Sequence, residues 1–280
     1  MSALTRRELL FALAAAPGTG PRPACQTNAW RIDPGKFSEV LAVLEKIRRY
    51  GFEGFETGFR NVEGQFARAS RAREEMARFG MRFLGVHIFL LEYDHATSIA
   101  PWELISRVAA GAAALGAERL ILSGRGLTSG NSLDRGALDR KVAALDRTGE
   151  SSSQQGLRLA YHNHDAEFAR EGEEIEALLA RTSMRLILDA GHVRRARSSV
   201  VDFFRRHHRR IDGIHLRDFR GDEQVPLGQG EYDLKPLAAA IREAGWGGWL
   251  IAEEERLNDV KPGDAAVAPA REGLRRLFGV

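Results

Sequence analysis

The sequence predicts an α/β chain folded as a single (β/α)8 TIM barrel. Eight apolar stretches alternate with segments of helical period, and four of the later stretches end directly in His, Asp or Glu. Such an ending is typical of a parallel barrel strand, which is buried on both faces and delivers its last side chains to the mouth of the barrel. The short connections between strands and helices favour right-handed parallel crossovers.

Strands are expected at the apolar runs, starting with PACQTNAW, which contains Cys25, the sole cysteine. Apolar residues spaced by three and four predict the helices between them, and several of these helices end beside a glycine, the usual left-handed helix stop. The expected strands are 23–30, 52–58, 81–89, 118–123, 157–162, 185–189, 212–217 and 248–253. The expected helices are 37–50, 63–79, 102–115, 133–145, 174–182, 200–209, 234–244 and 265–278.

The chain is expected to divide into residues 1–22, an export signal or a disordered segment, and a barrel domain over 23–280. Arg6 and Arg7, followed by the apolar stretch 9–16, resemble a twin-arginine export signal and predict a periplasmic protein. An ordinary amphipathic start in a cytoplasmic protein is the alternative. A core large enough for one barrel fits the length of 280 residues and the hydrophobic share of 44%.

Composition excludes several classes of partner. The formal net charge is only +3, which does not predict binding to nucleic acid. No apolar run reaches the length of a transmembrane helix, so stable membrane insertion is not expected. A single cysteine cannot form an intrachain disulfide. A homo-oligomer is compatible with all of this.

Alternation along the strands sorts the residues at their ends. In 212–217, Ile214 and Leu216 face the helices, so His215 and Arg217 face the barrel axis. Other residues expected to point inward by the same alternation or by their place on a strand are Glu56, His87, His162, His164, Asp189 and Glu253.

Carboxylates and imidazoles that converge in a barrel interior are costly unless a cation neutralises them. A mixed set of imidazole and carboxylate donors without thiolate suits Mn, Zn, Co or Fe better than Ca, and Mg less readily. The sequence therefore predicts one divalent metal centre and leaves the ion open.

A family resemblance rests on five segments. LILDAGH (186–192), GIHLRDF (213–219), PLGQGEYDLKPL (226–237) and GWLIAEEE (248–255) resemble the last three strands of the sugar phosphate isomerase/epimerase superfamily, which has a xylose-isomerase-like TIM barrel; YHNHDAEF (161–168) resembles the strand-five signature of one branch. The similarity extends over nearly the whole chain from Cys25. The resemblance implies a metal held by one residue from each of strands five to eight, here His162, Asp189, His215 and Glu253.

Two positions depart from the family pattern. Most members have glutamate where this chain has His162, so His164 or Glu167 is the alternative first ligand. Arg217 stands where the strand-seven motif commonly has lysine. Arginine stays charged near neutral pH, which favours an electrostatic or oxyanion-binding role for Arg217 over that of a base.

The predicted function is a divalent-metal-dependent sugar isomerase or epimerase that acts through an enediolate on a keto sugar or polyol. A dehydratase or lyase acting on an inosose or a 3-keto-glycoside is the alternative on the same scaffold. The candidate bases are Glu56, His164 and Glu167, because a base must reach the substrate and titrate near the working pH. Candidate substrate contacts are His87, His192 and Trp30.

Two other classes remain as hypotheses. A phosphodiesterase resembling endonuclease IV needs further metal ligands and an extensive cationic surface. An exported sugar-binding protein keeps the metal without turnover. Exchange of deuterium from heavy water into a keto sugar separates an enzyme from a binding protein.

Overall fold

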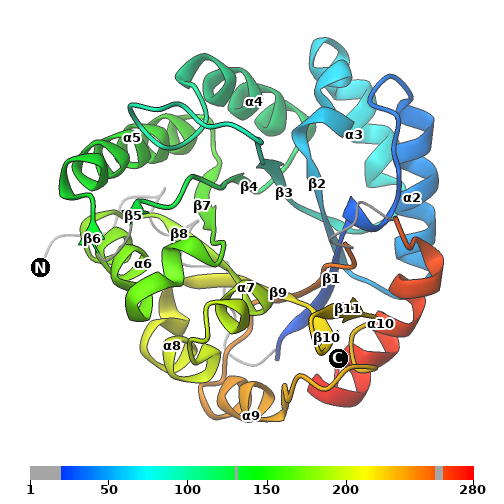
Figure 1. Cartoon of the computed structure of the whole chain (residues 1–280). Helices are drawn as coiled ribbons and strands as arrows, with labels where there is room; N and C mark the ends of the chain where they lie inside the picture. Colours follow the sequence, from blue (N-terminus) through cyan, green and yellow to red (C-terminus); the bar gives the residue numbers. More distant parts are fainter. Residues whose placement is uncertain (1–19, 130–131, 256–260) are drawn as a thin grey trace, which may run out of the picture.

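Eight parallel strands close into a barrel in the order β1-β12-β9-β8-β7-β4-β3-β2, as predicted. The computed structural model describes residues 20–129, 132–255 and 261–280. Figure 1 shows the ring of strands enclosed by a ring of helices. The barrel strands are β1 (Arg22–Gln26), β2 (Gly54–Gly58), β3 (Arg82–Ile88), β4 (Arg119–Leu122), β7 (Arg158–His162), β8 (Arg185–Asp189), β9 (Ile211–Leu216) and β12 (Trp249–Ala252).

Helices cover the outside of the barrel, each packing its apolar stripe against the strands. Within the described ranges, no helix has the length and apolar character needed to cross a membrane. The candidate export signal lies almost entirely outside the described residues. The helices are α2 (Phe37–Arg49), α3 (Ala69–Ala77), α4 (Trp102–Leu115), α5 (Arg135–Gln154), α6 (Ala169–Arg181), α7 (Ala190–Arg195), α8 (Val200–His207), α9 (Lys235–Glu243) and α10 (Asp264–Phe278).

The barrel interior has its own small core, separate from the large core between strands and helices. Alternate strand residues point to opposite faces, so the inward-facing set packs below the mouth. Asp189 pairs with His215 in the register of β8 and β9, and Ile251 pairs with His215 in that of β12 and β9. The ends of these three strands therefore lie level. The inner core consists of Ala24, Leu84, Ile121, Ala160, Ile187, Trp249 and Ile251.

The sequence did not predict two small hairpins or the short helix α7. The hairpins are β5 (Thr128–Ser129) with β6 (Ser132–Leu133), and β10 (Asp218–Arg220) with β11 (Glu223–Val225). The loop that follows β11 folds around Asp218, whose carboxylate accepts hydrogen bonds from the backbone N–H groups of Gly228 and Gly230 at 2.8 and 2.9 Å. A Cβ at Gly230 would lie 2.3 Å from Asp218 Oδ1, so the close approach requires glycine.

Candidate metal centre and cavity

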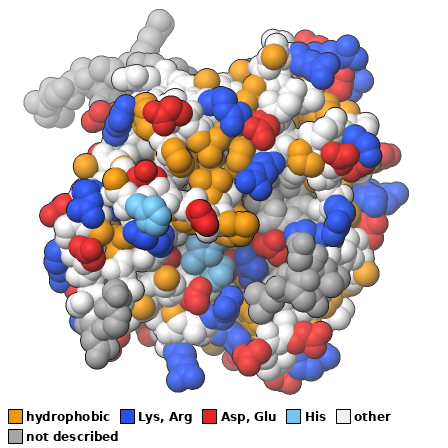
Figure 2. Space-filling view, turned by 45° about the horizontal axis from the view of Figure 1, so that its top comes forward, with side chains coloured by type: hydrophobic (Ala, Val, Ile, Leu, Met, Phe, Trp, Pro, Cys, Tyr) orange, Lys and Arg blue, Asp and Glu red, His pale blue; other side chains and the backbone are white. Residues whose placement is uncertain are grey.

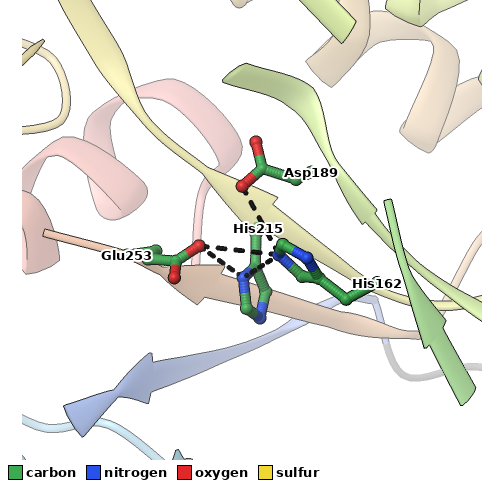
Figure 3. A group of neighbouring side chains, drawn as sticks. All are labelled: His162, Asp189, His215 and Glu253. Atoms are coloured by element: carbon green, nitrogen blue, oxygen red, sulfur yellow. Dashed lines mark hydrogen bonds and ion pairs between the residues drawn. The ribbon is translucent and has the colours of Figure 1, made fainter. Parts of the chain in front are cut away.

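Four buried side chains meet at the carboxyl ends of neighbouring strands. His162 ends β7, Asp189 ends β8, His215 lies on β9 and Glu253 directly follows β12. One donor atom from each lies within 4.8 Å of the other three. His162 Nε2 is 3.1 Å from His215 Nδ1 and 3.5 Å from Asp189 Oδ2, and His215 Nδ1 is 2.6 Å from Glu253 Oε2. Figure 3 shows all four side chains directed at one point.

The donor set fits a divalent transition metal. Two imidazole nitrogens and two carboxylate oxygens without thiolate suit Mn, Zn, Co or Fe. In the described part of the chain this is the one such group of His, Cys, Asp or Glu. The buried cluster can therefore hold a metal, and its chemistry leaves the identity of the ion open.

Opposite charges in the cluster shift the ionisation of its members. Burial alone would lower the pKa of His215, but the carboxylates of Glu253 and Glu56 raise it to about 10. Burial alone would raise the pKa of Glu253, but Arg217 and His215 hold it well below its usual value. The pKa of Asp189 is likewise lowered, against the effect of burial, by Arg217 and His192. Both carboxylates are therefore ionised at neutral pH, whereas the ring of His215 carries a proton that a bound cation would have to displace.

Arg217 connects the cluster to the cavity above it. Its Nε donates to Asp189 Oδ2 at 2.9 Å, and its Nη2 lies 2.7 Å from Glu253 Oε2. These carboxylates raise its pKa, although burial opposes the increase. A permanent cation therefore lies beside two candidate metal ligands and lines the cavity.

The cavity has a volume of about 560 Å³. His164 and His192 line it with ring centroids 4.7 Å apart, and His87 lies 4.9 Å from the ring of His162. Burial, together with the neighbouring imidazoles, lowers the pKa of His164 to about 3 and that of His87 well below its usual value. These rings are therefore neutral at neutral pH. Figure 2 shows pale-blue histidine surface near the middle of the face that carries the mouth.

Asparagine side chains hold the strand ends in place. Asn163 Oδ1 accepts from the backbone N–H of Asp189 at 2.9 Å, and Asn163 Nδ2 donates to the carbonyl of Asp189 at 3.3 Å. Asn28, beyond β1, donates to Glu253 Oε1 at 3.2 Å. The two bonds of Asn163 join the ends of β7 and β8, and the single bond of Asn28 holds the carboxylate of Glu253.

Five predicted site residues do not line the cavity: Asp189 and His215 of the four-donor cluster, and Glu56, Glu167 and Trp30. Glu167 is fully buried and accepts hydrogen bonds from Tyr161 Oη at 2.6 Å and from the backbone N–H of His164 at 3.0 Å. Its carboxylate is also 3.7 Å from Lys141 Nζ, and Glu167 does not line the cavity. The role of Glu167 as a base or first ligand stays a prediction, and these contacts favour a structural role instead. His162, not Glu167, is the strand-five residue of the four-donor cluster.

Glu56 and Trp30 likewise make their contacts outside the cavity lining. Glu56 is fully buried, and its Oε2 is engaged by His215 Nε2 at 2.8 Å, which leaves it without access to a substrate. The indole of Trp30 lies against Gly263, where an added Cβ would be 3.4 Å from Nε1. Neither residue lines the cavity. The roles of Glu56 as a base and Trp30 as a substrate contact stay predictions, which the cavity lining does not favour.

Several residues that line the cavity had no role predicted from the sequence, and most of them lie beyond the end of an apolar run. Asn28 follows β1 by two residues, and its short polar side chain after an apolar strand is the signal that was available. The lining residues without a predicted role are Asn28, Gly58, Phe59, Arg60, Asn61, Phe89, Glu255 and Lys261.

Comparisons with known proteins agree with this geometry. The chain is 28% identical over 177 residues to an inosose dehydratase of Lacticaseibacillus casei, a match covering 51% of this chain and 59% of that enzyme. It therefore spans somewhat more than half the length of that relative. An inosose dehydratase of Geobacillus thermodenitrificans is 24% identical over 200 residues, covering 59% of this chain and 67% of the relative.

Solved structures share the fold at low sequence identity. A D-allulose 3-epimerase from Methylomonas sp. in complex with D-allulose superimposes with a TM-score of 0.73 and 15% identity, covering 94% of this chain and 99% of that one. A 3-keto-D-glucoside 4-epimerase from E. coli gives a TM-score of 0.68 and 15% identity, covering 93% and 100%. The family model described as xylose isomerase-like TIM barrel matches residues 44–278. The chain belongs to the xylose isomerase-like TIM barrel family.

Proposed function

We propose that this protein is a divalent-metal-dependent isomerase or epimerase of a small keto carbohydrate. The observation that carries the proposal is the buried four-donor cluster at the floor of a polar cavity of about 560 Å³, a size that suits a sugar or small glycoside. A divalent ion held by His162, Asp189, His215 and Glu253 would supply Lewis-acid polarisation of a substrate carbonyl.

The protein's own groups divide the remaining work. Arg217 presents a fixed positive charge at the cavity floor, where it can stabilise negative charge that develops on a substrate oxygen. His87 and His192 reach the cavity as hydrogen-bonding groups for hydroxyls. These polar groups orient a substrate over the cluster, and the buried surroundings strengthen each contact.

His164 is the one predicted base that lines the cavity. Its imidazole stays unprotonated through the neutral range because its pKa lies at about 3. A base this weak accepts a proton from carbon only when the neighbouring carbonyl is strongly polarised, because proton transfer follows the difference in pKa between donor and acceptor. The proposed reaction therefore depends on His164 and the electrostatic groups together.

Isotope exchange tests the proposal. Protein loaded with Mn²⁺ is incubated in heavy water with keto sugars and 3-keto-glycosides, and proton NMR follows the carbon next to the carbonyl. Deuterium should enter that carbon, and the Asp189→Ala/His215→Ala variant should show no exchange. Binding of a sugar without exchange would instead support the alternative of a non-catalytic binding protein.

A dehydratase is the second candidate, because the sequence relatives are inosose dehydratases. Elimination also begins with removal of the proton beside a carbonyl, so the same cavity groups can serve it. An inosose incubated with the metal-loaded protein would lose water to give a conjugated enone, which absorbs in the ultraviolet. Appearance of that absorbance favours the dehydratase, and exchange without it favours the isomerase or epimerase.

Export through a twin-arginine signal is proposed from the sequence alone, on Arg6, Arg7 and the apolar stretch 9–16. The proposal predicts a mature protein without this segment in the cell envelope fraction. Mass spectrometry of the native protein checks it, and an intact Met1 in the cytosol would contradict it.

A further inference from the structure

We propose that Glu56 is a positioning residue that orients His215 and keeps its Nδ1 directed at the metal centre. The inference rests on the proposed metal site and adds a residue to it from outside the cavity. Glu56 lies on β2, which is separated from β9 in the barrel by β1 and β12. Its side chain therefore reaches across the barrel interior to a strand that is not its neighbour.

The imidazole of His215 is held between two carboxylates on its opposite nitrogens. Nε2 lies 2.8 Å from Glu56 Oε2, whereas Nδ1 lies 2.6 Å from Glu253 Oε2 and 3.1 Å from His162 Nε2. Only Nδ1 faces the shared point of the four donors. When the ring is neutral, a carboxylate that accepts a hydrogen bond from Nε2–H keeps the hydrogen on Nε2. The lone pair then lies on Nδ1, where a cation could bind.

The backbone of β2 fixes the direction of Glu56. The neighbouring residue Phe55 faces outward, where its ring stacks on Phe83 with centroids 4.6 Å apart. Glu56 must then point inward, because successive strand residues alternate between faces. The register shift between β2 and β3 falls between Phe55 and Glu56, opposite Phe83 and Gly85. The stacking of Phe55 and the pairing with β3 therefore hold the backbone of β2 in place at Glu56.

The carboxylate of Glu56 is committed to this one partner. Its Oε1 is buried and makes no hydrogen bond within the described part of the chain, and its Oε2 bonds to His215. An unpaired buried carboxylate oxygen is costly, so its retention calls for a compensating role. The contact with His215 Nε2 supplies such a role.

The test compares metal binding in Glu56→Leu, Glu56→Gln and a control, Glu174→Gln. Glu174 is also a fully buried carboxylate, but it pairs with Lys141 at 2.7 Å outside the cavity. The probe is Co²⁺, whose dissociation constant is measured by titration calorimetry and whose visible absorption reports the ligand geometry. Loss of a hydrogen-bond partner behind a ligand histidine typically weakens metal affinity about 10- to 100-fold.

We expect Glu56→Leu to weaken Co²⁺ binding about 10- to 100-fold and to alter the Co²⁺ spectrum. Glu56→Gln keeps an acceptor oxygen, so it should recover part of the affinity and the spectrum. Glu174→Gln should keep both unchanged even where it lowers the unfolding temperature. If Glu56→Leu does not fold, Glu56→Gln must still shift the spectrum.

Two results would overturn the inference. Unchanged affinity and spectrum in both Glu56 variants would mean that Glu56 does not orient His215. Equal losses in Glu56→Gln and Glu174→Gln would mean a general effect of removing a buried charge. Failure of the wild-type protein to bind Co²⁺, Mn²⁺ or Zn²⁺ is a separate outcome, which would refute the metal centre of the proposed function and this inference with it.

Discussion

Arg217 Nε lies 2.9 Å from Asp189 Oδ2, so a guanidinium is already hydrogen-bonded to a candidate metal ligand. The same guanidinium lies 2.7 Å from Glu253 through Nη2. Part of the negative charge at the centre is therefore balanced by the protein itself. A metal ion bound there shares both carboxylates with a permanent cation, which opposes the binding of that ion.

Replacing Arg217 with methionine should separate its effect on metal affinity from its effect on turnover. We expect metal affinity to rise by roughly tenfold or more, since two unit charges 4 Å apart interact by about 1 kcal/mol in water and about 4 kcal/mol at an effective dielectric of 20. Turnover should fall by about 10²- to 10³-fold, as is typical when one group that stabilises developing negative charge is lost. Calorimetry with Mn²⁺ and a steady-state assay measure the two quantities.

Arg217→Lys provides the matched control, because it keeps the charge and removes the planar two-sided contact. It should bind metal as weakly as the wild type. A fall in metal affinity in Arg217→Met would contradict this account, since it would show that the guanidinium chiefly holds Asp189 and Glu253 in place.

Removal of the metal should abolish turnover and leave the fold intact. The four donors lie at the mouth, whereas the inner core packs beneath them and does not depend on a ligand. Treatment with a chelator should therefore stop activity with little change in the far-ultraviolet circular dichroism, and Mn²⁺ or Co²⁺ should restore it. Full activity after exhaustive chelation, verified by elemental analysis, would exclude a catalytic metal.

Asp189 and His215 can be tested by substitution. Asp189→Ala/His215→Ala removes two of four donors, so bound metal and turnover should both fall below detection. Asp165→Asn is a useful comparison, because Asp165 lies 3.4 Å from His192 and contributes no donor to the four-residue cluster. It should keep its metal. Unchanged activity in the double variant would refute the catalytic role of the centre.

The barrel was predictable because period and length agree in every repeat. Apolar runs of strand length alternate with helical periods, and the eight predicted strands match the observed ones within a few residues at each end. Helix α5 shows the limit of the method. It continues to Gln154 through a polar segment, where Thr148 and Ser152 are buried although neither is apolar. Periodicity that counts only apolar side chains ends such a helix too early.

Strand alternation placed all four members of the buried cluster among a wider set of inward-facing residues, and the family resemblance selected these four from that set. Contacts between side chains on opposite sides of the barrel could not be predicted from the sequence. Whether Glu56 reaches a substrate or His215 depends on strand order and stagger, which single-strand patterns do not contain. The pairing of Glu167 with Lys141 likewise could not be predicted, because Lys141 lies on α5 and is remote in sequence. Tertiary packing therefore decides which carboxylates join the four-donor cluster and which pair with other side chains.

Glu167 should prove structural when it is replaced by glutamine. The amide still offers an oxygen to the Tyr161 hydroxyl or the His164 backbone, so we expect turnover within about tenfold of the wild type and a loss of about 1–3 kcal/mol in unfolding free energy from weakened buried hydrogen bonds. A catalytic base could not be replaced this way. A loss of turnover of 10³-fold or more with unchanged substrate affinity would restore Glu167 as a base.

Asp212 should stabilise the opposite end of the barrel in a pH-dependent manner. Its buried carboxylate accepts from Arg119 Nε at 3.0 Å and Arg185 Nε at 2.8 Å, and lies 3.4 Å from Arg158 Nη1. Burial alone would raise the pKa of Asp212, but these arginines hold it below the usual value of 3.8. Asp212→Asn should cost about 3–5 kcal/mol at pH 7, because it removes a buried carboxylate that pairs with the buried Arg119 and the partly exposed Arg158 and Arg185.

The sign of the pH dependence follows from the direction of the shift. A carboxyl whose pKa is lower in the folded state stabilises the fold above its unfolded pKa and loses that contribution as the pH falls through its folded pKa. The difference in unfolding free energy between wild type and Asp212→Asn should therefore stay constant from pH 7 to 5 and shrink below about pH 4. Urea unfolding at each pH measures it. Asp139→Asn, which breaks an exposed pair with Arg181, should cost less than about 1 kcal/mol. If Asp212→Asn also costs less than about 1 kcal/mol, the prediction is wrong. The carboxylate of Asp212 then does not offset the repulsion between the arginines.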